Sequence, residues 1–158
     1  MEVNLKTNAI RILESKNISF ETVEYEFNEE EIDAVSVAKK LGVNLEIVFK
    51  TLVAHNEENN FYVFVIPGCY ELNLKKAAKA CNSKKIELIK VKELQPITGY
   101  IRGGCSPIGM KKLFPTFIDE SAQLFDYIYV SAGVRGMQIK ISPSDLLNVI
   151  NGQYSDLI

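Results

Sequence analysis

The sequence lacks the residue combinations that most hydrolases and nucleotide-dependent enzymes use. Its one histidine, His55, begins a polar segment, residues 55–60, that is expected to form a turn away from any serine or cysteine nucleophile. A single histidine also excludes a His-rich metal site. No GxxxxGK[ST] phosphate loop and no strand-linked GxGxxG fingerprint occurs, which argues against the ATPase, kinase and dehydrogenase classes.

Paired cysteines and long apolar runs are missing as well. The three cysteines, Cys69, Cys81 and Cys105, have no CxxC spacing, and an odd number argues against a disulfide framework. We expect them to be reduced, small buried side chains. No apolar run reaches the roughly 18 residues of a membrane helix, and the first eleven residues lack a secretion signal. These features predict a cytoplasmic protein without a membrane segment.

What is present suits one globular domain over residues 1–158, with 47% hydrophobic residues and a net charge of −2. The charge is unevenly spread: residues 1–60 carry −6, residues 61–115 carry +7 and residues 116–158 carry −3. A basic segment within an acidic chain is a candidate binding surface for a polyanion such as a nucleic acid. Lysines on solvated helix faces would give the same pattern, so charge alone leaves both interpretations open.

The apolar periodicity predicts a mixture of strands and helices without a regular βαβ repeat. Strands separated by a polar turn at 47–54 and 61–66 predict a hairpin. We expect further strands at 18–27, 116–119, 127–131 and 137–141, and helices at 4–15, 33–42, 74–81, 90–94 and from Ser142 onward. This pattern favours the α+β class, with a curled, barrel-like, mixed or antiparallel sheet flanked by short helices.

Lys50 is the charged residue that fits its segment least. Strand alternation places it on the same face as Val48, Leu52 and Ala54. An ammonium on such a face must reach solvent, form an ion pair or bind a ligand, because an unpaired buried charge is costly. Lys50 therefore either protects a sheet edge from aggregation or points into a cleft, where it can bind a phosphate or a developing oxyanion.

Two glycine-rich segments, residues 98–109 and 131–136, are the other candidate binding elements. Glycines let the backbone approach a ligand closely and turn its amides inward, which suits the carbonyl of an acyl ester. Arg135, in the second segment, is placed to contact a phosphate or to cap the end of a sheet. Turn-rich connections without a binding role have a similar composition.

Taken in order, four stretches resemble the YbaK/ProX (YbaK/EbsC) family of freestanding aminoacyl-tRNA editing domains. They are residues 48–52, 98–112, 115–119 and 128–136. The N-terminal pattern, a helix followed by residues 18–20 and then Tyr25, is similar to the Cys-tRNA(Pro) deacylase branch. The resemblance implies a barrel-like α/β fold, no metal or cofactor, and removal of cysteine from the acceptor end of mischarged tRNA(Pro).

The resemblance also implies roles for particular residues. Lys50 matches the family's essential lysine, and we expect it to be the catalytic residue. The substrate-binding residues implied are Tyr25 and Thr51 in the pocket, Gly103, Gly104 and Ser106 in a glycine-rich wall that holds the aminoacyl carbonyl and terminal adenosine, and Gly133 and Arg135 in the second loop. Gln138 stands where many members have Asp, so the role of that carboxylate does not carry over to this chain.

The implied mechanism is substrate-assisted: the thiol of the bound cysteine attacks its own ester carbonyl and leaves as a cyclic thiolactone. Other functions remain open at this point. A deacylase of Ala-tRNA(Pro) or of a broader range of substrates would use water, and a non-catalytic tRNA or synthetase adaptor would keep the fold without turnover. Whether the protein works alone or docks on prolyl-tRNA synthetase is also open.

Overall fold

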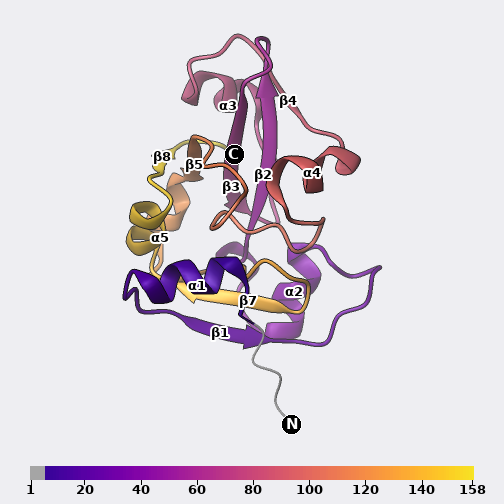
Figure 1. Ribbon diagram of the computed structural model, residues 1–158, viewed down its shortest axis with the longest axis vertical. Helices are drawn as coiled ribbons and strands as arrows, with labels where there is room; N and C mark the ends of the chain where they lie inside the picture. Colours follow the sequence, from indigo (N-terminus) through magenta and orange to yellow (C-terminus); the bar gives the residue numbers. More distant parts are fainter. Residues whose placement is uncertain (1–5) are drawn as a thin grey trace.

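A computed structural model describes residues 6–158 and shows two sheets joined at one point (Figure 1). The smaller sheet is antiparallel, in the order β1 (Glu21–Glu24), β7 (Met137–Ile141), β6 (Ile128–Ser131). The larger is mixed, in the order β4 (Ile86–Leu88), β2 (Phe49–Asn56), β3 (Phe61–Pro67), β5 (Thr116–Asp119), β8 (Gln153–Ser155). A parallel bridge between Val48 and Tyr129 joins the two. The α+β class is confirmed, and the described strands form two linked sheets rather than a closed barrel.

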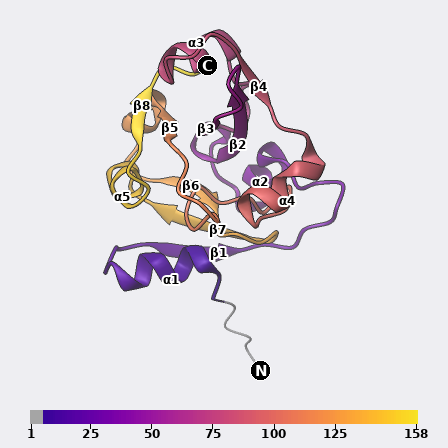
Figure 2. The same cartoon turned by 45° about the horizontal axis from the view of Figure 1, so that its top comes forward.

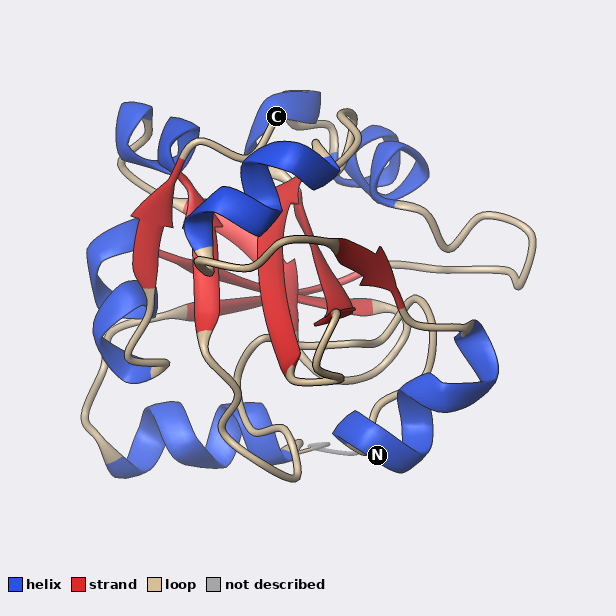
Figure 3. Cartoon of the chain, turned by 90° about the horizontal axis from the view of Figure 1, so that it is seen from above, coloured by secondary structure: helices blue, strands red, loops and turns tan. Residues whose placement is uncertain are grey.

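Short helices surround the sheets (Figure 3). They are α1 (Asn8–Ser15), α2 (Ala34–Leu41), α3 (Leu74–Ala80), α4 (Val91–Thr98), α5 (Pro143–Val149) and the 3-10 turns η1 (Leu45–Ile47) and η2 (Glu120–Leu124). Side-chain oxygens of Asp33, Asn73 and Ser142 accept hydrogen bonds from first-turn amides and fix where three helices start. None of the helices within residues 6–158 is long and apolar enough to cross a membrane.

Two predicted boundaries at the N-terminal end were wrong. The helix expected from residue 4 begins at Asn8, because the Thr7 hydroxyl accepts from the Ile10 amide at 3.2 Å and caps it; residues 1–5 lie outside the described range. The strand expected over 18–27 is confined to Glu21–Glu24, with one further backbone bond from Tyr25 to Gly136.

The prediction that His55 lies in a turn was also wrong. His55 is in β2, where it pairs with Phe61. The strand continues to Asn56, whose Oδ1 accepts from the amides of Glu58 and Asn60 and closes the turn after it. Strands β4 and β8 were not predicted: each has three residues and pairs with a strand distant in sequence, so neither gives a periodic signal.

Alternation along β6 and β7 separates two environments. Ile128 and Val130, with Ile139 and Ile141 opposite, pack in the main core together with α1, which lies along the small sheet (Figure 2). Tyr129 points to the other face, toward α2. A second core lies on the face of the large sheet that packs against α3, where the centres of the stacked Phe64 and Phe117 rings are 5.7 Å apart. The alternation matters for the site, because Gln138 lies on the face of β7 that looks away from α1.

Candidate functional site

One edge of β2 is open between its neighbours, and the main pocket lies there. Along one edge β2 pairs with β3; along the other it pairs with β4 at residues 54–56 and meets β6 at Val48. The gap holds a pocket of about 390 Å³. Residues 48–53, in β2 and just before it, form one wall, and the start of α2 and residues 88–91 and 94 around α4 form others. The remaining lining residues are Arg102, Gly103 and Cys105 from the glycine-rich segment, and Ser131 and Gln138 from the small sheet.

The backbone of Thr51 points into this gap. The Val53 carbonyl accepts from the Ile89 amide on the open edge, whereas the Val48 carbonyl accepts from Gly68 on the β3 side. Backbone groups alternate between the two edges of a strand, so the amide and carbonyl of Thr51 share the direction of Val53. The Thr51 amide is therefore a backbone hydrogen-bond donor that faces the pocket next to Lys50.

Lys50 supplies the positive charge of the pocket. It is half-buried, and within residues 6–158 it forms no ion pair. Burial lowers the pKa of its ammonium, while the more distant carboxylates of Glu71 and Asp33 act in the opposite direction. Asp33 is itself engaged at the start of α2, where its carboxylate accepts from the Ser36 amide and, at 2.6 Å, from the Ser36 hydroxyl. Lys50 is therefore left able to bind a ligand.

The pocket does not contain an activated protein nucleophile among the described residues that line it. Cys105 is present, but burial raises the pKa of its thiol to about 12, so it is protonated near neutral pH. His55 is five residues beyond Lys50 on β2, about 17 Å along the strand, and its Nε2 lies 3.7 Å from Glu87. A Cys–His or Ser–His mechanism is not available at this geometry.

Gly103 lies on the pocket wall, as the resemblance implied. Its φ of +83° is in the left-handed region, and a Cβ at this position would lie 2.9 Å from Cβ of Ile32. Glycine is required there on both counts, because a side chain would be strained and would displace Ile32. The resulting wall is thin backbone that a ligand can approach closely.

Three further candidates in the glycine-rich loops support the wall rather than line the pocket. The hydroxyl of Ser106, a fully buried residue, accepts from the Ile108 amide at 3.2 Å. Gly104 packs against the backbone of Val134, and Arg135 donates from Nε to the carbonyl of Arg102 at 2.9 Å. These contacts hold the two loops together.

The remaining candidates, Tyr25 and Gly133, lie behind the pocket lining. Tyr25 packs at the edge of the cluster formed by Val37, Ala38 and their neighbours. Gly133 sits under the Tyr100 ring, where a Cβ would approach Cε1 to 2.8 Å. The direct contacts that the resemblance implies for Tyr25, Gly104, Ser106, Gly133 and Arg135 stay predictions, whereas Lys50, Thr51 and Gly103 are brought together at one pocket.

Gln138 is a pocket residue that sequence reasoning noticed only as a departure from the family pattern. In residues 137–141 apolar and polar residues alternate, which normally places the polar ones in solvent. Gln138 is instead 4% exposed, lies directly opposite Ser131 in β6, and lines the same pocket as residues of β2 and α2. Alternation with Met137 and Ile139 predicts that Gln138 lies on the opposite face of the strand, but it does not predict that this face is buried.

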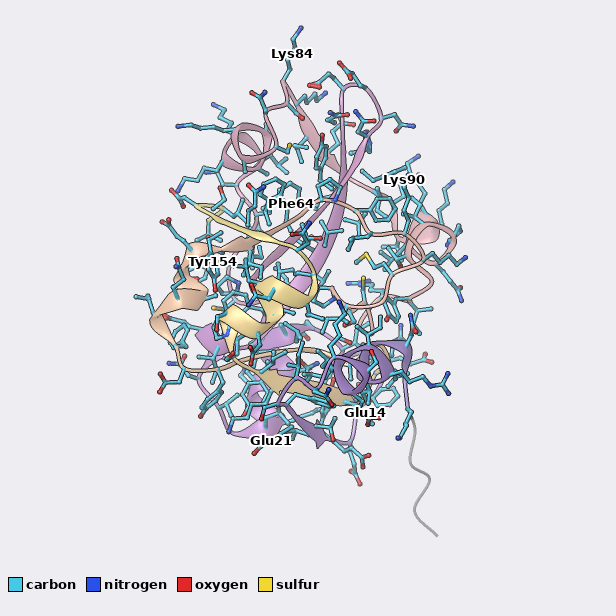
Figure 4. All side chains as sticks on the ribbon, turned by 60° about the vertical axis from the view of Figure 1, so that its left-hand side comes forward. Glu14, Glu21, Phe64, Lys84, Lys90 and Tyr154 are labelled. Atoms are coloured by element: carbon cyan, nitrogen blue, oxygen red, sulfur yellow. The ribbon has the colours of Figure 1, made fainter. Side chains whose placement is uncertain are left out.

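The rim of the pocket is basic. Lys90 and Arg102 line its mouth and are exposed. Lys84 and Lys90 project from the half of the molecule around the large sheet, whereas Glu14 and Glu21 lie in the other half (Figure 4). Lys84 and Lys90, two lysines of the basic segment, thus lie in the half of the molecule around the large sheet. Within residues 6–158, no group of three or more His, Cys, Asp or Glu side chains could hold a metal ion.

Fold and pocket together define an α+β domain with a pocket that contains Lys50, has Lys90 and Arg102 at its mouth, and shows no activated nucleophile among the described residues that line it. The chain belongs to the aminoacyl-tRNA editing domain family, whose model matches residues 29–149. It is 48% identical over 152 residues to an Enterococcus faecalis protein provisionally named Cys-tRNA(Pro)/Cys-tRNA(Cys) deacylase EbsC, with 96% of this chain and 93% of the relative covered. The family resemblance of the sequence is confirmed.

Solved structures show the same fold. One, described provisionally as a trans-editing enzyme for prolyl tRNA synthetase, superposes with a TM-score of 0.83 at 24% identity, covering 98% of each chain. Another, of the hypothetical protein APE2540, gives a TM-score of 0.87 at 19% identity over 96% of this chain and 99% of the other. At these identities the likeness establishes the fold alone.

Proposed function

We propose that this protein is a trans-editing deacylase that removes cysteine from mischarged Cys-tRNA(Pro). The observation that carries the proposal is Lys50, whose ammonium forms no ion pair within residues 6–158 and lies in a pocket whose described lining offers no activated nucleophile. Membership of the editing-domain family and 48% identity to a protein named for this activity support the substrate class. In the same proposal, residues 1–158 form one domain, and the protein acts in the cytoplasm.

The substrate's own thiol acts as the nucleophile. Its sulfur forms a bond to the ester carbonyl carbon, the bond from that carbon to the ribose oxygen breaks, and the thiol proton ends on the ribose hydroxyl. The products are free tRNA and a cyclic thiolactone, which water opens to cysteine. The protein contributes positioning and stabilisation of the negative charge on the carbonyl oxygen.

Lys50 and the Thr51 amide are the donors next to the reacting centre. Lys50 stabilises the developing oxyanion or the neighbouring ribose-phosphate, and the Thr51 N–H points into the same gap. Gly103 lets the terminal nucleotide lie against the wall. In this proposal the other candidates are positioning residues that hold the two loops and the edge of the pocket in place: Tyr25, Gly104, Ser106, Gly133 and Arg135.

The basic rim receives the acceptor end of tRNA. Lys90 and Arg102 at the mouth match the phosphates that flank a terminal adenosine whose aminoacyl group has entered the pocket. In this proposal the pocket and its rim contact the acceptor end, and a partner supplies the contacts that select tRNA(Pro) over other tRNAs. Docking on prolyl-tRNA synthetase is the arrangement we propose for that selection.

The deciding experiment compares deacylation of Cys-tRNA(Pro), Ala-tRNA(Pro) and S-methylated Cys-tRNA(Pro) under the same conditions. We expect turnover of the first substrate and little of the other two. Equal rates for the methylated and free thiols would reject thiol attack and leave a water-dependent deacylase. No turnover of any aminoacyl-tRNA, with tRNA binding retained, would identify a non-catalytic adaptor instead.

A further inference from the structure

Two buried polar atoms in the pocket have no partner. Gln138 Oε1 and Thr51 Oγ1 are inaccessible to solvent, and neither finds a hydrogen-bond partner within residues 6–158. Both residues line the pocket that contains Lys50. Buried polar groups are nearly always paired, because an unpaired one keeps its full desolvation cost. Each of them is a candidate partner for a ligand group that reaches it from the pocket.

The polar neighbours of Gln138 are already engaged. Ser131 lies directly opposite on β6, where its hydroxyl accepts from the Gly133 amide at 3.2 Å and does not donate to Gln138 Oε1. On the other side Gln138 pairs in register with Val23, which is apolar. Asp33, the carboxylate that lines the pocket, is bound to Ser36. The carbonyl of the Gln138 amide and the Thr51 hydroxyl are therefore left for the ligand.

The polarity of these atoms selects which part of the substrate they contact. An ester carbonyl or a phosphate needs donors, and Lys50 and the rim cations supply them. A carbonyl oxygen such as Gln138 Oε1 only accepts, so it needs an N–H or O–H from the ligand. In a cysteinyl ester that has entered past the rim, the donors near the reacting carbonyl are the α-amino group, the thiol and the free ribose hydroxyl. Of these we take the α-amino group, because it is the strongest donor when protonated and is attached one carbon from the reacting carbonyl.

We propose that Gln138 Oε1 and Thr51 Oγ1 bind the α-amino group of the aminoacyl ester, an inference that rests on the proposed deacylase function. The acceptors are uncharged, so the amine is recognised by hydrogen bonds rather than by an ion pair. They lie in the same pocket as the Lys50 ammonium, and holding the amine there keeps the carbonyl end of the substrate directed to Lys50. The pocket thereby requires a free amine as well as a thiol.

The test removes the amine from the ligand and the acceptors from the protein, separately and together. The ligands are Cys-tRNA(Pro) and 3-mercaptopropionyl-tRNA(Pro), which keeps the thiol and the ester but lacks the α-amino group. The variants are Gln138→Met, which keeps the length of the side chain, and Thr51→Val, which keeps its shape and the backbone amide. Thermal melts check folding, and loss of an unpaired buried group predicts that Gln138→Met melts no lower than the wild type.

We expect each variant to lower kcat/KM on Cys-tRNA(Pro) by about tenfold to a hundredfold, the range for a lost hydrogen bond to a buried partner. On the desamino substrate the same variants should change kcat/KM by less than about twofold. Equal losses on both substrates would overturn the proposal, because the side chains would then act without the amine. So would unchanged turnover of Cys-tRNA(Pro) in both variants.

A binding measurement separates this inference from the deacylase proposal. The probes are two stable 3′-amide analogues of the terminal adenosine, one carrying cysteine and the other 3-mercaptopropionate, titrated calorimetrically. We expect the wild type to bind the cysteinyl analogue about tenfold or more tightly than the desamino analogue, and Gln138→Met to bind the two alike. A wild type that binds both equally overturns the amine site, even if Cys-tRNA(Pro) is deacylated. A wild type without turnover that still prefers the amine overturns the deacylase function alone.

Discussion

Arg135 donates a 2.9 Å hydrogen bond from Nε to the carbonyl oxygen of Arg102, so one arginine holds the other by its backbone. The contact joins the loop after β6 to the glycine-rich segment that carries Gly103. It uses Nε of the half-buried Arg135 and leaves the Arg102 side chain exposed at the mouth of the pocket. The two arginines therefore have different expected roles in tRNA binding.

Substitution of each arginine by glutamine separates those roles. Arg102→Gln should weaken tRNA binding and reduce the slope of log K against log salt by about one, because one phosphate contact is lost. Arg135→Gln should lower kcat and loop stability and leave the salt slope near that of the wild type. Filter binding at several salt concentrations measures both. Equal changes of slope would mean that Arg135 also contacts phosphate.

Lys50→Met should separate stability from activity. The substitution removes a half-buried ammonium that forms no ion pair within residues 6–158, from a strand face that it shares with Leu52 and Ala54. We expect the free energy of unfolding to rise by about 1 kcal/mol, which corresponds to a melting temperature higher by roughly 3 °C, and turnover to fall to background. The exposed Lys79 on α3 is the matched control, and Lys79→Met should leave both quantities unchanged. Full activity in Lys50→Met would remove Lys50 from the mechanism.

The pH profile should carry the signature of Lys50. Burial lowers its pKa from 10.5, so the charged form, which binds the oxyanion, is lost as pH rises through a value below 10.5. Single-turnover rates, corrected for spontaneous ester hydrolysis, should show this alkaline decline. Because the Glu71 carboxylate raises the pKa of Lys50, Glu71→Gln should move the decline to lower pH. A shift to higher pH, or none, would contradict the assignment.

Cys105 should be dispensable although it lies in the pocket. Its thiol has a pKa of about 12 because of burial, and is therefore protonated and unreactive near neutral pH. We expect Cys105→Ala to retain kcat/KM within about threefold, and iodoacetamide at pH 7 to leave the wild type active. Loss of turnover in a folded Cys105→Ala variant would revive a protein-thiol mechanism.

Gly133→Ala should destabilise the protein more than Gly42→Ala. Both glycines have left-handed φ values, +104° and +69°, but a Cβ at Gly133 would lie 2.8 Å from Cε1 of Tyr100, whereas Gly42 has open space. We expect a cost of about 1 kcal/mol at Gly42 from backbone strain, and about 2 kcal/mol or more at Gly133. Urea denaturation measures the two. Equal costs would show that Tyr100 moves aside freely.

The parts of the fold that were predictable carry their signals locally. The β2–β3 hairpin follows from two β-branched runs around a polar turn, and α2 follows from Asp33 at its start and Gly42 at its end. Strands β4 and β8 gave no such signal, because each is three residues long and is defined by its partner strand. His55 was misplaced because its polar neighbours concealed how far β2 extends.

The site was predictable in its residues more than in its geometry. Alternation indicated that Lys50 lies on an apolar face, and the resemblance ordered Thr51 and Gly103 around it. Neither could show that β2 lacks a strand neighbour beside Thr51, since that depends on where β4 ends and where β6 meets Val48. The burial of Gln138, a polar residue, was not predicted either, because it also depends on how distant segments pack.

The open stretch of β2 also has a consequence for self-association. A free strand edge is a template on which another chain can add, which is how many β proteins aggregate. Here β4 covers the edge from Ala54 onward and β6 meets it at Val48, so the uncovered stretch, residues 49–53, is flanked on both sides. A strand added there could pair over this stretch alone, because β4 and β6 would block its extension in either direction. The same interruption that makes room for a small ligand thus limits how far another chain can pair with this edge.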